Sequence, residues 1–543
     1  MIVRALAAVL CAAFAAPAAV ADPVFRSFDG SGNNLANPTW GMAGTALIRL
    51  GPDSYTDGAG GMPGGPNPRA ISNAVVAQPA SMPSTINVSN MFWQWGQFID
   101  HDLDLVPTNP AAPAMIAVPA GDPQFDPGNT GAQVIPFTRS VFDPATGTGA
   151  GDPRQQINTL TSYIDASMVY GSNAASALSL RTLSGGKLSM SAEEMPPVLA
   201  DGNFVAGDIR INEQLGLLSM HALFVREHNM WADQIAAADP GLSDEEIFQR
   251  ARRYVGAEIQ AITYNEFLPI LLGGSGVGSY GGYDAGVNAT VSNEFAAAGF
   301  RLGHTMLPPE MARLNEDGSS IPQGPIALQD TFLNPGLIAD GGIESILRGL
   351  AATKAQEFDS MLVDDVRNFL FVAVPSGLDL AAVNIQRGRD HGLPSYNDLR
   401  EALGLPRIGD FFEPGVFLPD AAARLASIYT SVDDIDLWVG ALSEIHLPGA
   451  MVGPLLHALL TDQFSRARDG DRFWYESLDM FSDDEIEAIE ARSLAQIILD
   501  NTWIDTIQAN VFFAEARVAE PAALLLFAFG LTAAAAGRRV RRA

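Results

Sequence analysis

Cysteine is almost absent from this 543-residue chain. The single cysteine, Cys11, lies in an apolar leader that we expect to be removed. The rest of the chain can then form no disulfide and no thiolate metal site. Core packing, bound ions or a cofactor must stabilise it, and any metal centre must use histidine nitrogen or oxygen ligands.

Basic residues are also scarce. The chain has 32 Lys and Arg against 62 Asp and Glu, which gives a formal charge of −30. This balance argues against a nucleic-acid or anionic-membrane partner, because both bind basic surfaces. Its plainest consequence is solubility. The length and the 47% hydrophobic content allow two to four domains or one large helical one.

Long apolar runs occur only at the two ends. Residues 1–21 combine Arg4, an apolar run and the small-x-small sequence Ala19-Val20-Ala21. This pattern predicts a signal peptide that is cleaved before Asp22. The alternative is an amphipathic first helix, but the run has no polar face.

The C-terminal stretch 518–543 holds about 15 apolar residues, Ala522–Ala536, followed by four arginines. A full membrane span usually needs roughly 20 apolar residues. The stretch resembles the PEP-CTERM sorting tail of Gram-negative bacteria, with Ala519-Glu520-Pro521 in place of Pro-Glu-Pro. A cleaved tail would leave a secreted or cell-surface protein that meets the membrane only transiently, and an association with extracellular matrix would suit it. A permanent anchor is the alternative.

Between the ends we distinguish a Gly/Pro-rich arm, 22–89, and a body, 90–517, without a repeat. Strand-like alternation is scarce, whereas 213–236 has one apolar stripe of helical spacing. Capping boxes at Ser243–Glu246 and Ser482–Glu485 indicate two helix starts. The stretches 107–136 and 273–287 read as connecting loops. The pattern predicts one mainly α-helical domain.

Seven histidines narrow the search for chemistry. His101 is flanked by Asp100 and Asp102, an arrangement in which one acid could bind a cation while the imidazole faces a pocket. A solvated acidic helix face would give the same pattern. His304 stands in apolar surroundings, and Asn384 precedes an Arg-rich turn.

Two further patterns are ambiguous when taken alone. Oxygen-bearing side chains occupy every second position from Thr161 to Ser167, as a calcium site requires, although a polar loop would look the same. Arg210 and Glu213 lie three apart, and a surface salt bridge is the simplest reading.

Several segments together resemble the animal haem peroxidase (peroxidase–cyclooxygenase) superfamily. They are residues 95–104, 165–172, 226–229, 384–392 and 470–476, which occur in the family's order. The resemblance extends over about 25–515 and implies a single large helical haem peroxidase domain with few short strands.

On the distal side of the haem, the resemblance makes His101 the base that takes a proton from hydrogen peroxide and returns it to the leaving oxygen. Arg210 would stabilise the charge that develops there. Gln97 would position pocket water and any halide.

On the proximal side, His304 would be the iron ligand. Asn384 would accept a hydrogen bond from the other ring nitrogen of His304. Arg387 would bind a haem propionate. Asp100 and Glu213 match the carboxylates that form ester links to haem b. Gln214 stands where one family member has a sulfur-linked methionine, so no third link is expected.

The resemblance also implies Ca²⁺ held by Asp102, Thr161, Tyr163 through its carbonyl, Asp165 and Ser167. Because Asp102 adjoins His101, the ion would steady the distal histidine. We expect structural hydrogen bonding for the remaining histidines, His221, His228, His391, His446 and His457.

The implied activity is oxidation of halides, thiocyanate or small phenols by hydrogen peroxide, as in a response to oxidative stress. A fatty-acid dioxygenase would need a tyrosine three residues before the proximal histidine, where this chain has Arg301. A non-catalytic matrix or adhesion scaffold would not need His101, Arg210 and His304 together.

Overall fold

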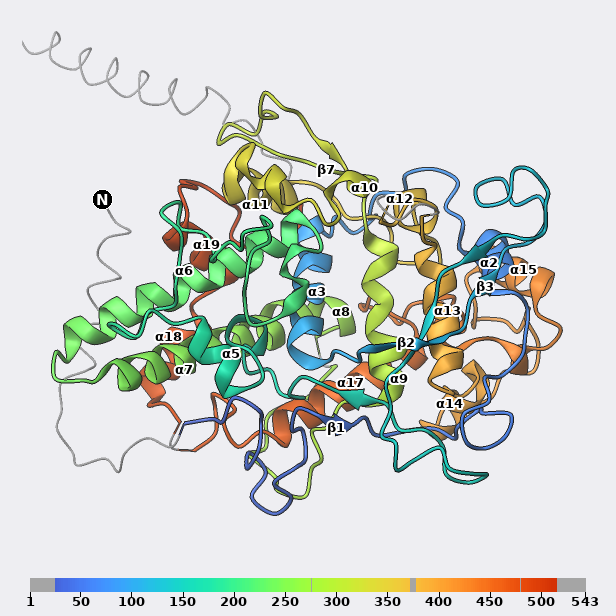
Figure 1. The fold of residues 1–543 in the computed structure, drawn as a ribbon, viewed down its shortest axis with the longest axis horizontal. Coiled ribbons are helices and arrows are strands. Elements are labelled where there is room, and N and C mark those ends of the chain that lie inside the picture. Colours follow the sequence, from blue (N-terminus) through green and yellow to red (C-terminus); the bar gives the residue numbers. More distant parts are fainter. Residues whose placement is uncertain (1–24, 275, 372–376, 479, 515–543) are drawn as a thin grey trace, which may run out of the picture.

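The computed structural model describes residues 25–274, 276–371, 377–478 and 480–514. The expected signal peptide and C-terminal tail lie outside these residues. Helices dominate the described chain, and the prediction of a mainly α fold with few short strands is confirmed (Figure 1). Among the described residues, no helix is long and apolar enough to cross a membrane.

The helices have these bounds: α2 Pro68–Ile71, α3 Asn90–Leu103, α4 Ser167–Tyr170, α5 Ala174–Ser179, α6 Leu215–Ala238, α7 Asp244–Ile262, α8 Leu268–Leu272, α9 Asn293–Ala297, α10 Leu328–Thr331, α11 Gly342–Ala352, α12 Asp364–Arg367, α13 Leu380–Asp390, α14 Tyr396–Ala402, α15 Pro419–Ile428, α16 Leu437–Leu442, α17 Pro454–Asp469, α18 Asp483–Glu490 and α19 Leu494–Asn501. Tighter or wider turns are η2 Ser72–Val76, η3 Ile209–Asn212, η4 Thr263–Phe267, η5 Gly299–Met306, η6 Pro335–Ala339 and η7 Val432–Asp434.

Helix α3 lies at the centre of the molecule, where it contacts α6, α11 and η5 (Figure 1). Its first turn is capped by Ser89, whose hydroxyl accepts a hydrogen bond from the backbone of Met91. Trp95 and Phe98 are fully buried, and the Phe98 ring stacks on Phe224 of α6 at 5.1 Å. A helix buried on most sides holds its side chains in fixed positions.

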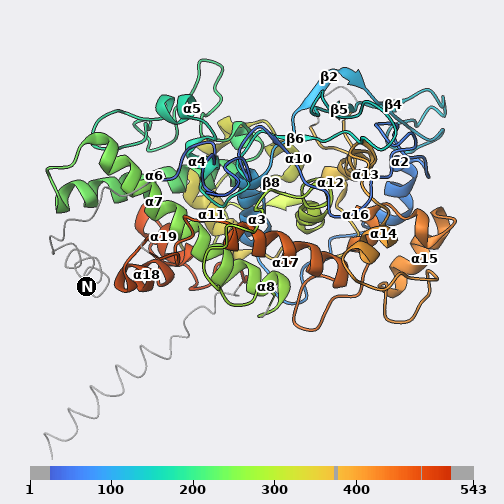
Figure 2. The same cartoon turned by 90° about the horizontal axis from the view of Figure 1, so that it is seen from below.

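Helices α6 and α7 run side by side and contact each other along their length (Figures 1 and 2). The capping box predicted at Ser243 is present, since its side chain accepts from the Glu246 backbone and the Glu246 carboxylate accepts from the Ser243 backbone. The same reciprocal bonds join Ser482 and Glu485 at the start of α18. Both helix starts were therefore predicted correctly.

The strands form four two-stranded antiparallel ribbons. They pair as β1 Thr45–Ala46 with β6 Ile157–Asn158, β2 Thr108–Pro113 with β5 Thr138–Ser140, β3 Ile116–Ala117 with β4 Val134–Ile135, and β7 Glu310–Met311 with β8 Ile326–Ala327. The expectation that 107–136 is only a connecting loop was wrong, because this stretch contains β2, β3 and β4. Pairing with residues some twenty positions away stabilises strands too short to show an alternating pattern.

The described part of the N-terminal arm is rich in turns, as expected, but it also belongs to the core. Leu47, Ile71, Val75 and Val88 are buried in the same hydrophobic cluster as the helices of the body. The arm therefore contributes to the packing of the domain and does more than cover it.

Candidate active site

His101 lies in the last turn of α3 and is 3% exposed. Burial, and then the nearby guanidinium of Arg210, hold the pKa of His101 well below its ordinary value, so the imidazole is neutral at pH 7. Its Nδ1 has no hydrogen-bond partner in the described chain and lies 3.7 Å from Oδ1 of Asp208. The site thus offers a neutral imidazole beside a carboxylate.

Arg210 is held by Asp208 in the short turn η3. Its Nε and Nη2 donate to the two oxygens of Asp208 at 2.9 and 3.0 Å, and Nη2 also donates to the carbonyl of Asp104 at 3.0 Å. Nη1 is left 3.7 Å from Asp100. The expected partner Glu213 therefore does not form the ion pair; Asp208 does. The two hydrogen bonds to Asp208 fix the plane of the guanidinium group and leave Nη1 as a donor for a bound molecule.

The charges of this pair persist over the physiological pH range. Burial disfavours ionisation of Asp208, but Arg210 and His101 outweigh it and hold the pKa of Asp208 below its usual range. Burial likewise opposes the charge of Arg210, yet Asp208 keeps the pKa of Arg210 above its ordinary value.

Gln97 joins a small amide network between α3 and α6. Its Oε1 accepts from Nε2 of Gln214 at 2.8 Å, and Nε2 of Gln214 also reaches Oε1 of Gln94 at 2.6 Å. Gln214 itself caps α6 by accepting from the Gly216 backbone. One member of the family that the sequence resembles has a sulfur-linked methionine at the position of Gln214. Here Gln214 donates a hydrogen bond to Gln97.

The two carboxyl groups expected to bind haem covalently lie near Arg210. Burial raises the pKa of Asp100 to about 6, and burial raises the pKa of Glu213 to about 7, both against the opposing charge of Arg210. Asp104 lies beside Asp100. Burial, and then the charge of Asp100, raise the pKa of Asp104 well above its usual range. Its Oδ2 has no hydrogen-bond partner among the described residues.

His304 lies in η5, which contacts α3, so the two functional histidines belong to neighbouring elements. Burial, and then Arg301, lower the pKa of His304 to about 3, which keeps the imidazole neutral and able to bind a metal. Asn384 of α13 contacts its Nδ1 at 2.8 Å, as predicted.

The direction of that contact differs from the prediction. The amide nitrogen of Asn384 faces Nδ1 of His304, whereas its oxygen accepts from Nη1 of Arg301 at 3.3 Å. Asn384 thus donates in this structure and does not accept. A histidine that binds iron through Nε2 carries its proton on Nδ1 and needs an acceptor there. Arg301 competes for the only oxygen of the amide, and no sequence pattern indicated this competition.

Arg387 follows Asn384 by one turn of α13. Its Nη1 donates to Ser140 at 2.7 Å and to Asp390 at 2.9 Å. Burial outweighs the Asp390 charge and lowers the pKa of Arg387 to about 10, which still leaves it charged at pH 7.

Two of the predicted calcium ligands, Asp165 and Ser167, contact a third, Asp102. Its Oδ2 accepts from the backbones of Asp165 and Ala166 at 2.9 and 3.0 Å. Its Oδ1 accepts from the backbone and hydroxyl of Ser167 at 2.5 and 2.7 Å. Ala166 has a left-handed φ of 63°, which turns the chain sharply around the carboxylate.

Two buried carboxyl groups meet in this turn, although no group of three or more His, Cys, Asp or Glu side chains among the described residues is placed to hold a metal ion. Burial and the neighbouring Asp165 raise the pKa of Asp102 to about 8, and burial raises the pKa of Asp165 as well. The hydroxyl of Thr161 and Oδ2 of Asp165 are buried and have no hydrogen-bond partner among the described residues. Two buried carboxyl groups with unpartnered oxygens beside them fit an oxygen-seeking cation such as calcium.

Several functional neighbours were missed by reasoning from sequence. Asp208 caps η3 and forms an ion pair with Arg210. Its position two residues before Arg210 could have indicated this contact. Asp104 and Arg301 act through contacts between distant segments and gave no local signal.

The other histidines follow the structural expectation only in part. His228 contacts Tyr170 and the carbonyl of Gly186, both at 2.8 Å. His391 contacts Ser140 and Asn293, and His457 contacts the carbonyl of Leu272. Both ring nitrogens of His221 and Nε2 of His446, however, have no hydrogen-bond partner in the described part of the chain.

Comparison with known proteins identifies the family. The model of the animal haem peroxidase family matches residues 25–512, so the chain belongs to this family. Eosinophil peroxidase of Homo sapiens is 38% identical to it, over 90% of this chain and 76% of that protein. Peroxinectin A of Dictyostelium discoideum is 37% identical, over 90% of this chain and 95% of that protein.

Solved structures agree. Peroxidase A from Dictyostelium discoideum superimposes with a TM-score of 0.83 at 36% identity, over 91% of this chain and 100% of that one. A fatty acid alpha-dioxygenase from Oryza sativa reaches a TM-score of 0.77 at 20% identity, over 93% of this chain and 90% of that one, which shows the shared fold alone. The chain is therefore a haem peroxidase, an enzyme that uses hydrogen peroxide and a reducing substrate.

The residues present fit a haem. His304 is neutral, its Nδ1 is engaged by Asn384, and its Nε2 makes no hydrogen bond within the described chain. A β-carbon at Gly303 would meet no atom within 4 Å, so space lies open beside the ligand position. Asp100 and Arg210 keep 26% and 19% of their side chains exposed in the protein alone, as expected for groups that face a bound cofactor.

Proposed function

We propose that this enzyme is an exported peroxidase that oxidises halides, thiocyanate or small phenols with hydrogen peroxide. One observation carries the proposal: His101, Asp208 and Arg210 form one cluster at the end of α3, the helix that contacts the turn holding His304. The haem iron would supply the centre at which the peroxide O–O bond is broken.

The residues of the chain would handle the proton and the charge. Neutral His101 would take the proton from one peroxide oxygen and return it to the leaving oxygen. The free Nη1 of Arg210, fixed by the two-point contact with Asp208, would stabilise the negative charge on that oxygen. Gln97, held by Gln214, would position water or a halide in the pocket.

On the other side of the haem, His304 would bind the iron and Asn384 would orient its ring. Arg387 would pair with a haem propionate. Arg301 supports peroxidase chemistry over the fatty-acid dioxygenase alternative, because a guanidinium bonded to Asn384 stands where that alternative needs a radical-forming tyrosine.

Two further elements belong to the proposal. Asp100 and Glu213, both near Arg210, would form ester links to haem b. Each link would replace a C–H bond of a haem methyl group by a C–O bond, and hydrogen peroxide would be the two-electron oxidant. Asp102, Thr161, Tyr163, Asp165 and Ser167 would bind Ca²⁺ and steady the end of α3 that carries His101. Residues 1–21 would direct export, and 518–543 would be removed at the cell surface.

The test is oxidation of iodide, thiocyanate and guaiacol by haem-loaded protein and hydrogen peroxide. At least one should turn over, and His101→Ala should slow the reaction by about 10²–10⁴-fold. The exposed Asp484→Asn is the control and should match the unsubstituted enzyme. A protein that holds haem yet oxidises none of the three would favour the matrix or adhesion scaffold.

The ester links are tested separately. Acidic organic solvent should extract haem from the double variant Asp100→Val/Glu213→Gln and leave it attached to the unsubstituted protein. Equal extraction from both would show that the links do not form.

A further inference from the structure

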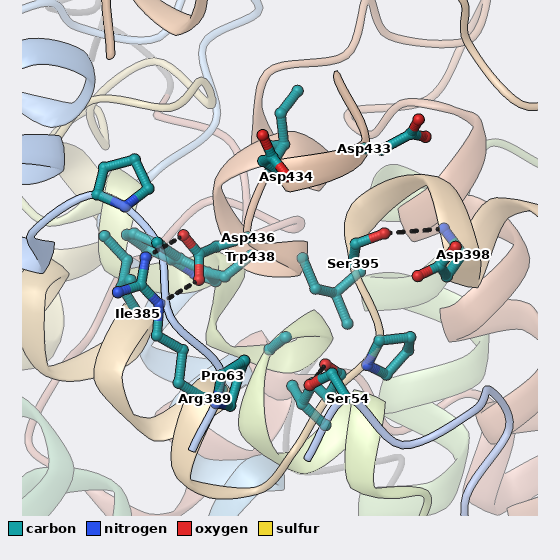
Figure 3. Close-up of a pocket in the computed structure, with 18 of the residues that line it drawn as sticks. Ser54, Pro63, Ile385, Arg389, Ser395, Asp398, Asp433, Asp434, Asp436 and Trp438 are labelled. Carbon is teal, nitrogen blue, oxygen red and sulfur yellow. Dashed lines mark hydrogen bonds and ion pairs between the residues drawn. The ribbon is translucent and has the colours of Figure 1, made fainter. Parts of the chain in front are cut away.

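A cavity of about 550 Å³ opens beside the C-terminal half of α13, where Ile385 and Arg389 line it (Figure 3). It lies between α13, α14, α16 and the turn Pro63–Pro66 of the N-terminal arm. Cavities of this size hold small organic molecules. The proposed peroxide chemistry makes no use of it.

Part of the wall of the cavity is apolar and part is polar. The apolar part includes Leu393, Leu437 and Trp438, together with Pro63, Pro66 and Pro394. An apolar wall of this kind binds the body of an organic ligand by excluding water from it.

The rim carries negative charge. Asp398, Asp433 and Asp434 line it, whereas the fourth carboxylate, Asp436, is already paired with Arg389 at 2.8 Å (Figure 3). Arg407 pairs with Asp398 and Asp433, at 2.7 and 2.6 Å, and with Glu401 at 3.0 Å, so one cation is shared by three acids.

Asp434 is the least compensated of these acids. It is exposed and accepts a hydrogen bond from Thr430 at 2.7 Å, and in the described chain no basic side chain pairs with it. Hydrogen bonding from Asn397, and then from Arg407, lowers the pKa of Asp433, so Asp433 is ionised at neutral pH.

Trp438 adds a second polar feature to the wall. Its ring is 3% exposed, and its Nε1 donor is buried without an acceptor among the described residues. Buried donors of this kind usually have a partner, and this one has none in the described chain. The indole face also attracts organic cations.

Asn384 connects the cavity to the active site. It lines the cavity and also contacts Nδ1 of His304 at 2.8 Å. A molecule bound here would therefore lie one side chain away from the proximal histidine.

We propose that this cavity binds a small organic cation, a protonated amine on an aromatic body. The apolar wall would take the ring, and the rim carboxylates, chiefly Asp434 with Asp433, would take the ammonium group.

Calorimetric titration of the haem-loaded full chain, without peroxide, tests this site. Tyramine, tyrosol and 4-hydroxyphenylacetate share one aromatic body and carry a positive, a neutral and a negative side chain. Tyramine should bind with a Kd below about 1 mM, and tyrosol at least about tenfold more weakly. The anion should not bind.

Two variants locate the binding. Asp434→Asn should weaken tyramine about tenfold, and Gly64→Trp should abolish binding by filling the cavity. A β-carbon at Gly64 meets no atom within 4 Å, so the larger side chain has room without straining the fold. Asp484→Asn, an exposed acid on α18, is the control and should leave the affinity unchanged.

Equal affinities for tyramine and tyrosol would overturn the proposal, as would tyramine binding that survives in Gly64→Trp. Binding of Ca²⁺ at the rim in place of tyramine would overturn it as well. The titration involves no turnover, so its outcome does not depend on whether the proposed peroxidase activity is found.

Discussion

Burial and a neighbouring guanidinium act in the same direction on the imidazole of His101. Each disfavours the protonated ring, and together they hold the pKa of His101 well below 6.5. The nearby Asp208 carboxylate opposes them without reversing the shift.

The pH dependence of the reaction with peroxide follows from this shift. A base is active in its unprotonated form, so the rate should stay level as the pH is lowered from 8 to well below 6.5. Only below the depressed pKa of His101 should the rate fall. Stopped-flow mixing with hydrogen peroxide across this pH range measures it. A rate that halves near pH 6.5 would mean that His101 titrates as an ordinary histidine.

Asn384 has one amide oxygen for two donors, Arg301 and the Nδ1 proton that an iron-bound His304 would carry. Asn384→Asp supplies a second acceptor and satisfies both. A charged acceptor also strengthens the hydrogen bond and makes the imidazole a stronger donor to the iron.

We therefore expect Asn384→Asp to retain haem and to lower the ferric/ferrous potential. The shift should be roughly 60 mV for each 1.4 kcal/mol gained by the ferric form. Spectroelectrochemical titration measures it. Asn173→Asp adds the same charge at an exposed helix cap and should leave the potential unchanged. An unchanged or higher potential in Asn384→Asp would contradict the role given to Asn384.

Residue-level prediction from the sequence was possible where a motif has a residue type at a fixed place, and the roles of these residues stay predictions. His101, Arg210, His304 and Asn384 are brought to neighbouring elements in this way. The contact of Asp208 with Arg210 and that of Arg301 with Asn384 were missed, because they depend on folded geometry.

At the scale of elements, the turn that carries Arg210 is pressed against α4. A β-carbon at Gly207 would lie well inside contact distance of the backbone nitrogen of Gly171 and the backbone oxygen of Ser167. Neither backbone atom can move away as a flexible side chain could.

Gly207→Ala should therefore destabilise the protein by about 1–3 kcal/mol or more, because overpacking against backbone is relieved only by shifting an element. Denaturant unfolding measures the free energy. Gly149→Ala, where a β-carbon meets nothing within 4 Å, is the matched control. A Gly207→Ala variant as stable as this control would show that α4 and the Arg210 turn are not tightly packed.

The turn of residues 161–167 closes around Asp102 at the end of α3. If it binds calcium, the ion stabilises the folded state, by about 2.7 kcal/mol at a concentration one hundred times its Kd. Removing the ion with a chelator should lower the Tm and slow the reaction with peroxide, and added Ca²⁺ should restore both.

Asp102→Asn should abolish the response of Tm to Ca²⁺, whereas Asp484→Asn should keep it. Verified removal of metal without any change in Tm or rate would mean that the turn is stabilised by its hydrogen bonds to Asp102 alone.

Elements were predicted well where the signal was local. The capping boxes at Ser243 and Ser482 depend on residues three apart and were found correctly. The ribbons within 107–140 were missed, because strands of two to six residues form only through partners that the local pattern does not reveal.

At the scale of the whole molecule, one hydrophobic cluster joins the arm to the helices. With no cysteine in the described residues, this packing stabilises the domain without disulfides. The sequence predicted a large helical domain from its composition and helical periodicity. It could not predict that Leu47 and Val88 of the arm belong to the core, because that depends on contacts with residues hundreds of positions away.

The central claim is that the buried cluster on α3 and η3 and the histidine of η5 form a working peroxidase centre. The most direct test is an absorption spectrum of haem-loaded protein, followed by rapid mixing with hydrogen peroxide. We expect a Soret band that shifts within milliseconds and returns when iodide or a phenol is added, and a much slower shift in His101→Ala. A protein that folds without taking up haem, or whose Soret band does not respond to peroxide, would contradict it.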